Sequence, residues 1–80
     1  MKLHLYENTD YADDGANGDI NIGCVEAPRT LGLDAATELI HNAWIEFQKT
    51  EPNSDDEFRG FLMVEHGFKP CKDGEVLYVN

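Results

Sequence analysis

One apolar stripe constrains the fold of this chain more than any other feature of its sequence. Six apolar residues in the middle of the chain follow one another at intervals of three, one, three, one and three: Ala36, Leu39, Ile40, Ala43, Trp44 and Phe47. This spacing places all six side chains on one face of an α-helix, which must be buried against another element. Asp34 is a good N-cap residue, so the pattern predicts a helix from Asp34 to Lys49 or Thr50.

A second helix is predicted after the break at residues 52–53. Ser54 is followed three residues later by Glu57, which is the capping-box pattern of a helix start. Gly67 is expected to end this helix in the left-handed conformation. The buried stripe of the second helix is expected to contain Phe58, Phe61 and Leu62.

Alternating apolar and polar residues predict strands on both sides of the helical region. The first two are expected at about 2–7 and 19–26, and in the second one Ile20, Ile22 and Cys24 share a face. Near the C-terminus, Asp73-Gly74 is a strong signal for a two-residue hairpin turn. The residues on either side of this turn are therefore expected to pair as an antiparallel hairpin.

Together these elements predict one α+β domain over residues 1–80, with the order ββααββ. We expect a mostly antiparallel sheet of about four strands with two helices packed on one face. Eighty residues leave no room for a second core, and 41% hydrophobic residues supply enough apolar side chain for one.

The sequence also bears on the compartment. Its N-terminal segment alternates and lacks the apolar run of a signal peptide, and no stretch approaches the roughly 20 apolar residues of a membrane span. We therefore expect a cytoplasmic protein, in the host cytoplasm if the chain is phage-encoded. In that compartment Cys24 and Cys71 are expected to be free thiols, with a disulfide as the alternative.

The charge balance favours a positively charged partner. Sixteen acidic residues stand against six basic ones, which gives a formal net charge of −10. So large an excess destabilises a small domain through self-repulsion. It also disfavours direct binding to nucleic acid or to an anionic membrane, because both attract Lys and Arg.

The segment between the first two predicted strands is the most suggestive acidic stretch. It carries four carboxylates, Asp10, Asp13, Asp14 and Asp19. Three interpretations stay open: a solvated loop, an acidic recognition loop and a calcium loop. Against calcium, an EF-hand alignment from Asp10 places Ala12 at the third ligand position and Asn21 at the twelfth, where a bidentate Glu is needed.

A second acidic group opens the second predicted helix. It consists of Asp55, Asp56 and Glu57, with Glu46 projecting nearby. The simplest interpretation is that carboxylates suit the positive end of the helix dipole. The functional interpretation is that these carboxylates join the acidic segment 10–19 in a broader partner-binding surface.

Tyr6 and Tyr78 are expected on the sheet face that the helices leave uncovered, either as ordinary surface aromatics or as a protein-binding spot. The three histidines show no paired ligand spacing, and no Ser or Cys nucleophile has a recognisable local signature. The sequence therefore predicts a protein that is not an enzyme, with no cofactor and no metal site.

In its size, its αβ layout and its acidic segments 10–19 and 55–57, the chain resembles the small inhibitors that phages and mobile elements direct against bacterial defence. Anti-CRISPR proteins and nucleic-acid mimics belong to this class. The resemblance covers the whole chain through size and composition, and it includes no family motif, so it assigns no residue a role.

This resemblance implies an acidic surface that occupies a Lys/Arg-lined groove of a nucleic-acid-binding protein, such as a CRISPR effector subunit. One alternative is a generic interaction or regulatory module whose acidity serves solubility and which binds through its aromatic sheet face. The other is a calcium-responsive domain that uses the four aspartates of the segment 10–19.

Overall fold

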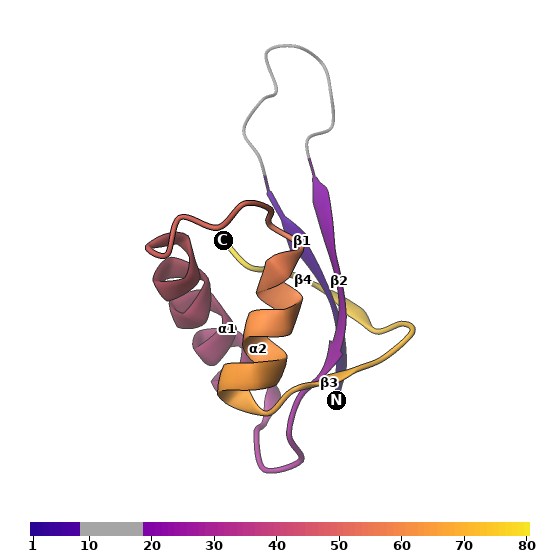
Figure 1. Ribbon diagram of the computed structural model, residues 1–80. Helices are drawn as coiled ribbons and strands as arrows, with labels where there is room; N and C mark the ends of the chain where they lie inside the picture. Colours follow the sequence, from indigo (N-terminus) through magenta and orange to yellow (C-terminus); the bar gives the residue numbers. More distant parts are fainter. Residues whose placement is uncertain (9–18) are drawn as a thin grey trace.

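A computed structural model describes residues 1–8 and 19–80, in which two helices cover one face of a four-stranded sheet (Figure 1). The elements in chain order are β1 (Lys2–Glu7), β2 (Ile20–Glu26), α1 (Leu33–Gln48), α2 (Glu57–His66), β3 (Lys69–Pro70) and β4 (Glu75–Tyr78). The α+β class and the order ββααββ are confirmed. The alternation of apolar and polar residues explains β1, because Leu3 and Leu5 point into the core and His4, between them, points away.

The strands lie in the order β3-β2-β1-β4. β2 pairs antiparallel with both β1 and β3, whereas β1 and β4 pair in parallel, so the sheet is mixed and mostly antiparallel. The predicted C-terminal hairpin is wrong, because β3 and β4 lie at opposite edges of the sheet. Residues 71–74, called the crossing segment below, connect these two edges.

Gly74 of the Asp73-Gly74 pair does not form a hairpin turn; it allows two backbone segments to pass close to each other. A Cβ atom added at Gly74 would lie 2.5 Å from the backbone nitrogen of Leu3 and 2.5 Å from the carbonyl carbon of Lys2. Real Cβ atoms do not come so close to backbone atoms, so only glycine lets the crossing segment pass this near to β1.

A β-bulge in β2 changes which of its residues face the helices. Leu5 pairs with Gly23 and Tyr6 with Asn21, which leaves Ile22 as the extra residue. Ile22 is buried in the core, whereas Cys24 pairs with His4 on the face that the helices leave uncovered. The expectation that Ile20, Ile22 and Cys24 share a face is therefore wrong.

Gly23 gives this bulge its backbone conformation, with φ at +120°. Its missing side chain also leaves room for Arg59 of α2, because a Cβ atom at Gly23 would lie 2.8 Å from the Arg59 Cδ. The Arg59 Nε donates a hydrogen bond to the carbonyl of Cys24 at 2.9 Å. The bulge thus anchors α2 to the sheet.

The predicted apolar stripes of both helices meet in one core. An aromatic cluster lies at its centre, where the Phe58 ring stands 5.0 Å from that of Trp44 and 5.2 Å from that of Phe47. Phe58 and Leu62 of α2 are fully buried, and Phe61 packs against the core from its margin.

Within the described ranges, no helix has the length and apolar character needed to cross a bilayer.

The helix starts differ from their predicted positions. α1 begins at Leu33 with Gly32 as its N-cap, so Asp34 lies in the first turn. α2 begins at Glu57, because the backbone N–H of Glu57 donates to the Ser54 carbonyl in a preceding tight turn. Half of the capping box forms, in which the Ser54 N–H donates to the Glu57 Oε2 at 3.0 Å. The end of α2 is as expected, since Gly67 is left-handed with φ at 72°.

Candidate functional site

Carboxylates from several elements gather where β1 ends and β2 and α2 begin. This acidic end consists of Glu7, Asp19, Asp55, Asp56 and Glu57. Figure 1 shows the 49–56 connection running over the upper ends of the two helices to the start of α2, beside the end of β1 and the start of β2. Asp55 and Asp56 line a shallow groove whose other wall includes Ile20 and Asn21 at the start of β2.

Glu7 and Asp55 are neighbouring carboxyl groups at this end. Burial of the Glu7 carboxyl, a hydrogen bond with Asp55 and the charge of Asp55 together raise the pKa of Glu7 from 4.5 to about 7. The Glu7 Oε1 atom is buried and has no hydrogen-bond partner among the described residues. Near neutral pH this pair therefore holds a proton in part of the molecules.

The structure places five of the eight predicted acidic residues, and they lie at three different sites. Asp55 and Asp56 precede α2 and Glu57 begins it, beside Glu7, whereas Glu46 is exposed in the last turn of α1. Asp19 is exposed just before β2 and contacts an aromatic side chain, as described below. Asp10, Asp13 and Asp14 lie outside the described residues, in the segment that joins Asn8 to Asp19.

Three aromatic rings occupy the open part of the sheet face opposite the helices. The rings of His4 and Tyr6 stack at 4.6 Å, and Tyr6 meets Tyr78 edge to face at 6.2 Å. We call His4, Tyr6 and Tyr78 the aromatic face. It borders the acidic end, because the Tyr78 hydroxyl donates to the Asp19 Oδ2 at 2.8 Å. This hydrogen bond, followed by the charge of Asp19, raises the pKa of the Tyr78 hydroxyl.

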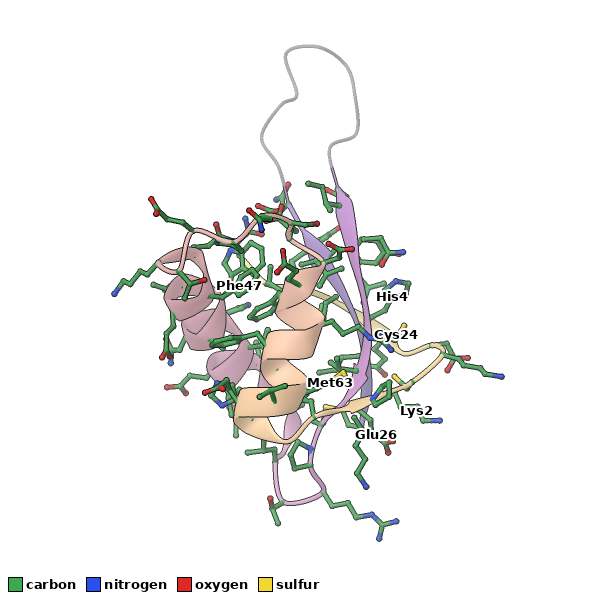
Figure 2. The ribbon with its side chains drawn as sticks, viewed as in Figure 1. Lys2, His4, Cys24, Glu26, Phe47 and Met63 are labelled. Atoms are coloured by element: carbon green, nitrogen blue, oxygen red, sulfur yellow. The ribbon has the colours of Figure 1, made fainter. Side chains whose placement is uncertain are left out.

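The rest of this sheet face is partly covered by the crossing segment. In Figure 2, His4, Cys24 and Lys2 lie on the side of the sheet away from the helices, whereas Phe47 lies on the helix side. Cys24 is only 7% exposed. Its burial follows from the crossing segment, which passes over the sheet on this side and approaches β1 at Gly74.

Sequence reasoning missed two residues that belong to this region. Glu7 looked like an ordinary strand end, because nothing local signals that Asp55, far along the chain, lies beside it. His4 received no role because the three histidines are scattered in the sequence, although alternation in the first strand places it on the same face as Tyr6. Across the described part of the chain, no three His, Cys, Asp or Glu side chains are arranged to hold a metal ion.

No protein-family model, curated protein or solved structure matches this chain. The function must therefore be argued from the chemistry of the acidic end and the aromatic face.

Proposed function

We propose that this protein is a non-enzymatic acidic inhibitor that occupies the basic groove of a nucleic-acid-handling protein. One observation carries the proposal: Glu7, Asp19 and the start of α2 bring five carboxylates to one end of the molecule. The segment 9–18, which leaves β1 and enters β2 at this end, has three more aspartates in its sequence.

Clustered carboxylates suit such a groove for electrostatic reasons. A nucleic-acid strand presents a phosphate about every 3.4 Å, and proteins that hold it line their grooves with Lys and Arg. The carboxylates of the acidic end offer the same sign of charge as these phosphates. Charge complementarity speeds association and makes it sensitive to salt, so moderate salt should release the complex.

The partner class is tested by capture from a nuclease-treated host lysate on the immobilised protein, with elution along a salt gradient and identification by mass spectrometry. We expect a nucleic-acid-binding protein, such as a CRISPR effector subunit, to elute at moderate salt. Nuclease treatment is essential, because a bridging nucleic acid would otherwise mimic a direct contact. A partner that resists salt and binds no nucleic acid would contradict the proposal.

The surface itself is tested with a charge-matched pair of variants. One variant changes four aspartates to asparagine: Asp55 and Asp56 of the acidic end, and Asp13 and Asp14 of the segment 9–18. The control removes four carboxylates from the first turns of α1, the last turn of α2 and the first residue of β4, as Asp34→Asn, Glu38→Gln, Glu65→Gln and Glu75→Gln.

Both variants change the net charge from −10 to −6 by neutralising four carboxylates. We expect the first to weaken binding of the captured partner at least about tenfold and the control by much less, because buried charge pairs at the interface dominate the loss. Equal loss in both would show that net charge alone acts, and unchanged binding in the first would exclude the acidic end as the site.

The aromatic face supports a second candidate, a module that binds another protein through its tyrosines. Tyr78 is 40% exposed beside Tyr6, and tyrosine is enriched among residues that dominate binding energy at interfaces. In this case Tyr6→Ala and Tyr78→Ala abolish binding, salt has little effect, and the acidic variant binds normally. The same captured partner therefore separates the two candidates.

A further inference from the structure

The pairing of β2 with β3 brings the two cysteines of the chain opposite each other. Val25 pairs with Pro70, and Glu26 pairs with Lys69, in antiparallel register. β3 ends at Pro70, and continuing this register by one residue places Cys71 opposite Cys24. Residues directly opposite in an antiparallel pair have Cα atoms about 4.5–5.5 Å apart, which lies within the range that a disulfide requires.

The surroundings of the Cys71 thiol agree with this placement. Burial raises the pKa of the Cys71 thiol, and the charge of the neighbouring Cys24 and a hydrogen bond with it contribute in the same direction. Both thiols are free, and the Cys71 Sγ donates to the carbonyl of Asp73 at 3.4 Å. Cys24 is buried beneath the crossing segment and Cys71 is half-buried, so an external reagent reaches Cys71 first.

We propose that Cys24 and Cys71 form a thiol pair that a small-molecule disulfide oxidises to a disulfide between β2 and the crossing segment. Cys71 gives up its proton and its thiolate attacks one sulfur of the reagent, which forms a mixed disulfide and releases one thiol. The Cys24 thiolate then attacks the Cys71 sulfur and releases the second thiol. Two protein thiols are oxidised, the reagent disulfide is reduced, and the two protons end on its thiols.

This disulfide fastens a weakly held part of the fold. β3 contains only two residues, and beyond it the crossing segment must reach the far edge of the sheet. A covalent bond at Cys71 ties the start of this segment to β2, next to His4, which pairs with Cys24 from β1. The bond also closes a long loop of the unfolded chain, so the oxidised protein should be more stable than the reduced one.

The test uses the folded full chain in buffers with increasing ratios of oxidised to reduced glutathione. After equilibration, free thiols are blocked with N-ethylmaleimide and the intact mass is measured. We expect a single oxidised species that has lost two hydrogens and carries neither glutathione nor N-ethylmaleimide. A species with glutathione on both cysteines, or a disulfide between two chains, would overturn the proposal.

Two serine variants show whether the thiols act as a pair. In Cys24→Ser the mixed disulfide at Cys71 cannot be resolved, so the glutathione adduct should accumulate. In Cys71→Ser the buried Cys24 should react at least about tenfold more slowly than Cys71 does in Cys24→Ser, because access limits exchange. If wild type holds the same adduct as Cys24→Ser at every ratio, the two thiols are not neighbours.

Two further measurements on the wild type check the mechanism and its effect. Oxidation should speed up about tenfold from pH 7 to pH 8, because the thiolate is the attacking species. The oxidised protein should melt several degrees above the reduced protein. An equal or lower melting temperature would contradict the claim that the disulfide fastens the crossing segment.

Discussion

The two faces of the sheet are built on different principles. Beneath the helices, Leu3, Leu5 and Val25 are at most 1% exposed and meet an aromatic cluster centred on Phe58. On the opposite face, polar and aromatic side chains lie around a four-residue crossing segment, and Val76 is 61% exposed. The inner face concentrates the hydrophobic stabilisation, while the outer face depends on close backbone approach, hydrogen bonds and charge.

This difference separates the part of the molecule that holds the fold from the part that is free to bind. Truncating a buried side chain of the inner face should lower the free energy of unfolding, whether or not that residue takes part in binding. Changes on the outer face and at the acidic end should act on stability only where a backbone contact or a buried charge is involved. The three variants below, in order of decreasing effect, test this separation.

Phe58→Ala should have the largest effect. Phe58 is completely buried and packs against Trp44 and Phe47, so its truncation leaves a cavity and costs about 3–5 kcal/mol. A domain of this size has about 5–15 kcal/mol of stability at most, so we expect a severely destabilised or unfolded protein. Urea denaturation followed by Trp44 fluorescence and circular dichroism measures the loss.

Val76→Ala is the matched control on the outer face. It removes apolar atoms from an exposed position and should change the free energy of unfolding by about 0.5 kcal/mol or less. If it destabilises the protein as much as Phe58→Ala does, the two faces do not differ in the way described.

Gly74→Ala should have the next largest effect, although it adds only one methyl group. The new Cβ would overlap with the backbone of Lys2 and Leu3, and backbone atoms of a paired strand cannot move aside easily. We expect a loss of about 2–3 kcal/mol, measured by urea denaturation.

Gly60→Ala makes the same chemical change where nothing lies within 4 Å of the added Cβ. Gly60 lies inside α2, where alanine is the better helix former, so the protein should gain about 0.5–1 kcal/mol. Opposite signs for the two glycine variants would establish the close approach at Gly74, and a neutral Gly74→Ala would refute it.

Glu7→Gln should have the smallest effect of the three and the opposite sign. Because the pKa of Glu7 is raised to about 7 in the folded protein, its contribution to stability is complete below about pH 4.5 and is lost as the pH rises through 7. Glutamine cannot ionise, so the variant does not lose stability in this way as the pH rises. After allowance for solvent screening of a partly exposed group, we expect it to be about 1 kcal/mol more stable than wild type at pH 8.

The measurement is the free energy of unfolding of both proteins at pH 5, 6, 7 and 8. The difference between them should grow as the pH rises. Glu65→Gln removes the same charge from an exposed position in the last turn of α2 and controls for net charge. A difference between Glu7→Gln and wild type that is independent of pH would contradict the carboxyl pair with Asp55.

The fold could be predicted from sequence wherever one local periodicity decides the structure. The stripe of α1 and the alternation of β1 give the correct faces, because burial follows spacing directly. The bulge at Ile22 and the placement of β4 beside β1 could not be predicted in this way. Because the bulge adds one residue to β2, the side chains beyond it point to the opposite face from the one that simple alternation predicts. Strand order depends on contacts between distant segments, which no local pattern reports.

The Asp73-Gly74 pair shows how a local signal can mislead. Its glycine predicts a hairpin turn, but glycine is needed here because two backbones pass close together, which only the tertiary structure reveals.

For the candidate site, the sequence identifies the carboxylates at the start of α2 and the two tyrosines. The pairing of Glu7 with Asp55, and of Asp19 with Tyr78, joins residues too far apart for any local pattern to connect.

The central position of β1 has a consequence for how the protein is made. β1 is synthesised before the strands that pair with it, yet one of its edges is paired by β4, and Asn80 hydrogen-bonds to Asn8 across 72 residues of sequence. During translation this edge of β1 therefore stays bare until residues 75–78 have been added, and bare strand edges recruit strands from other chains. Folding of this domain should wait for residues 75–78, so a ribosome that stalls before Glu75 would leave an aggregation-prone fragment rather than a smaller folded protein.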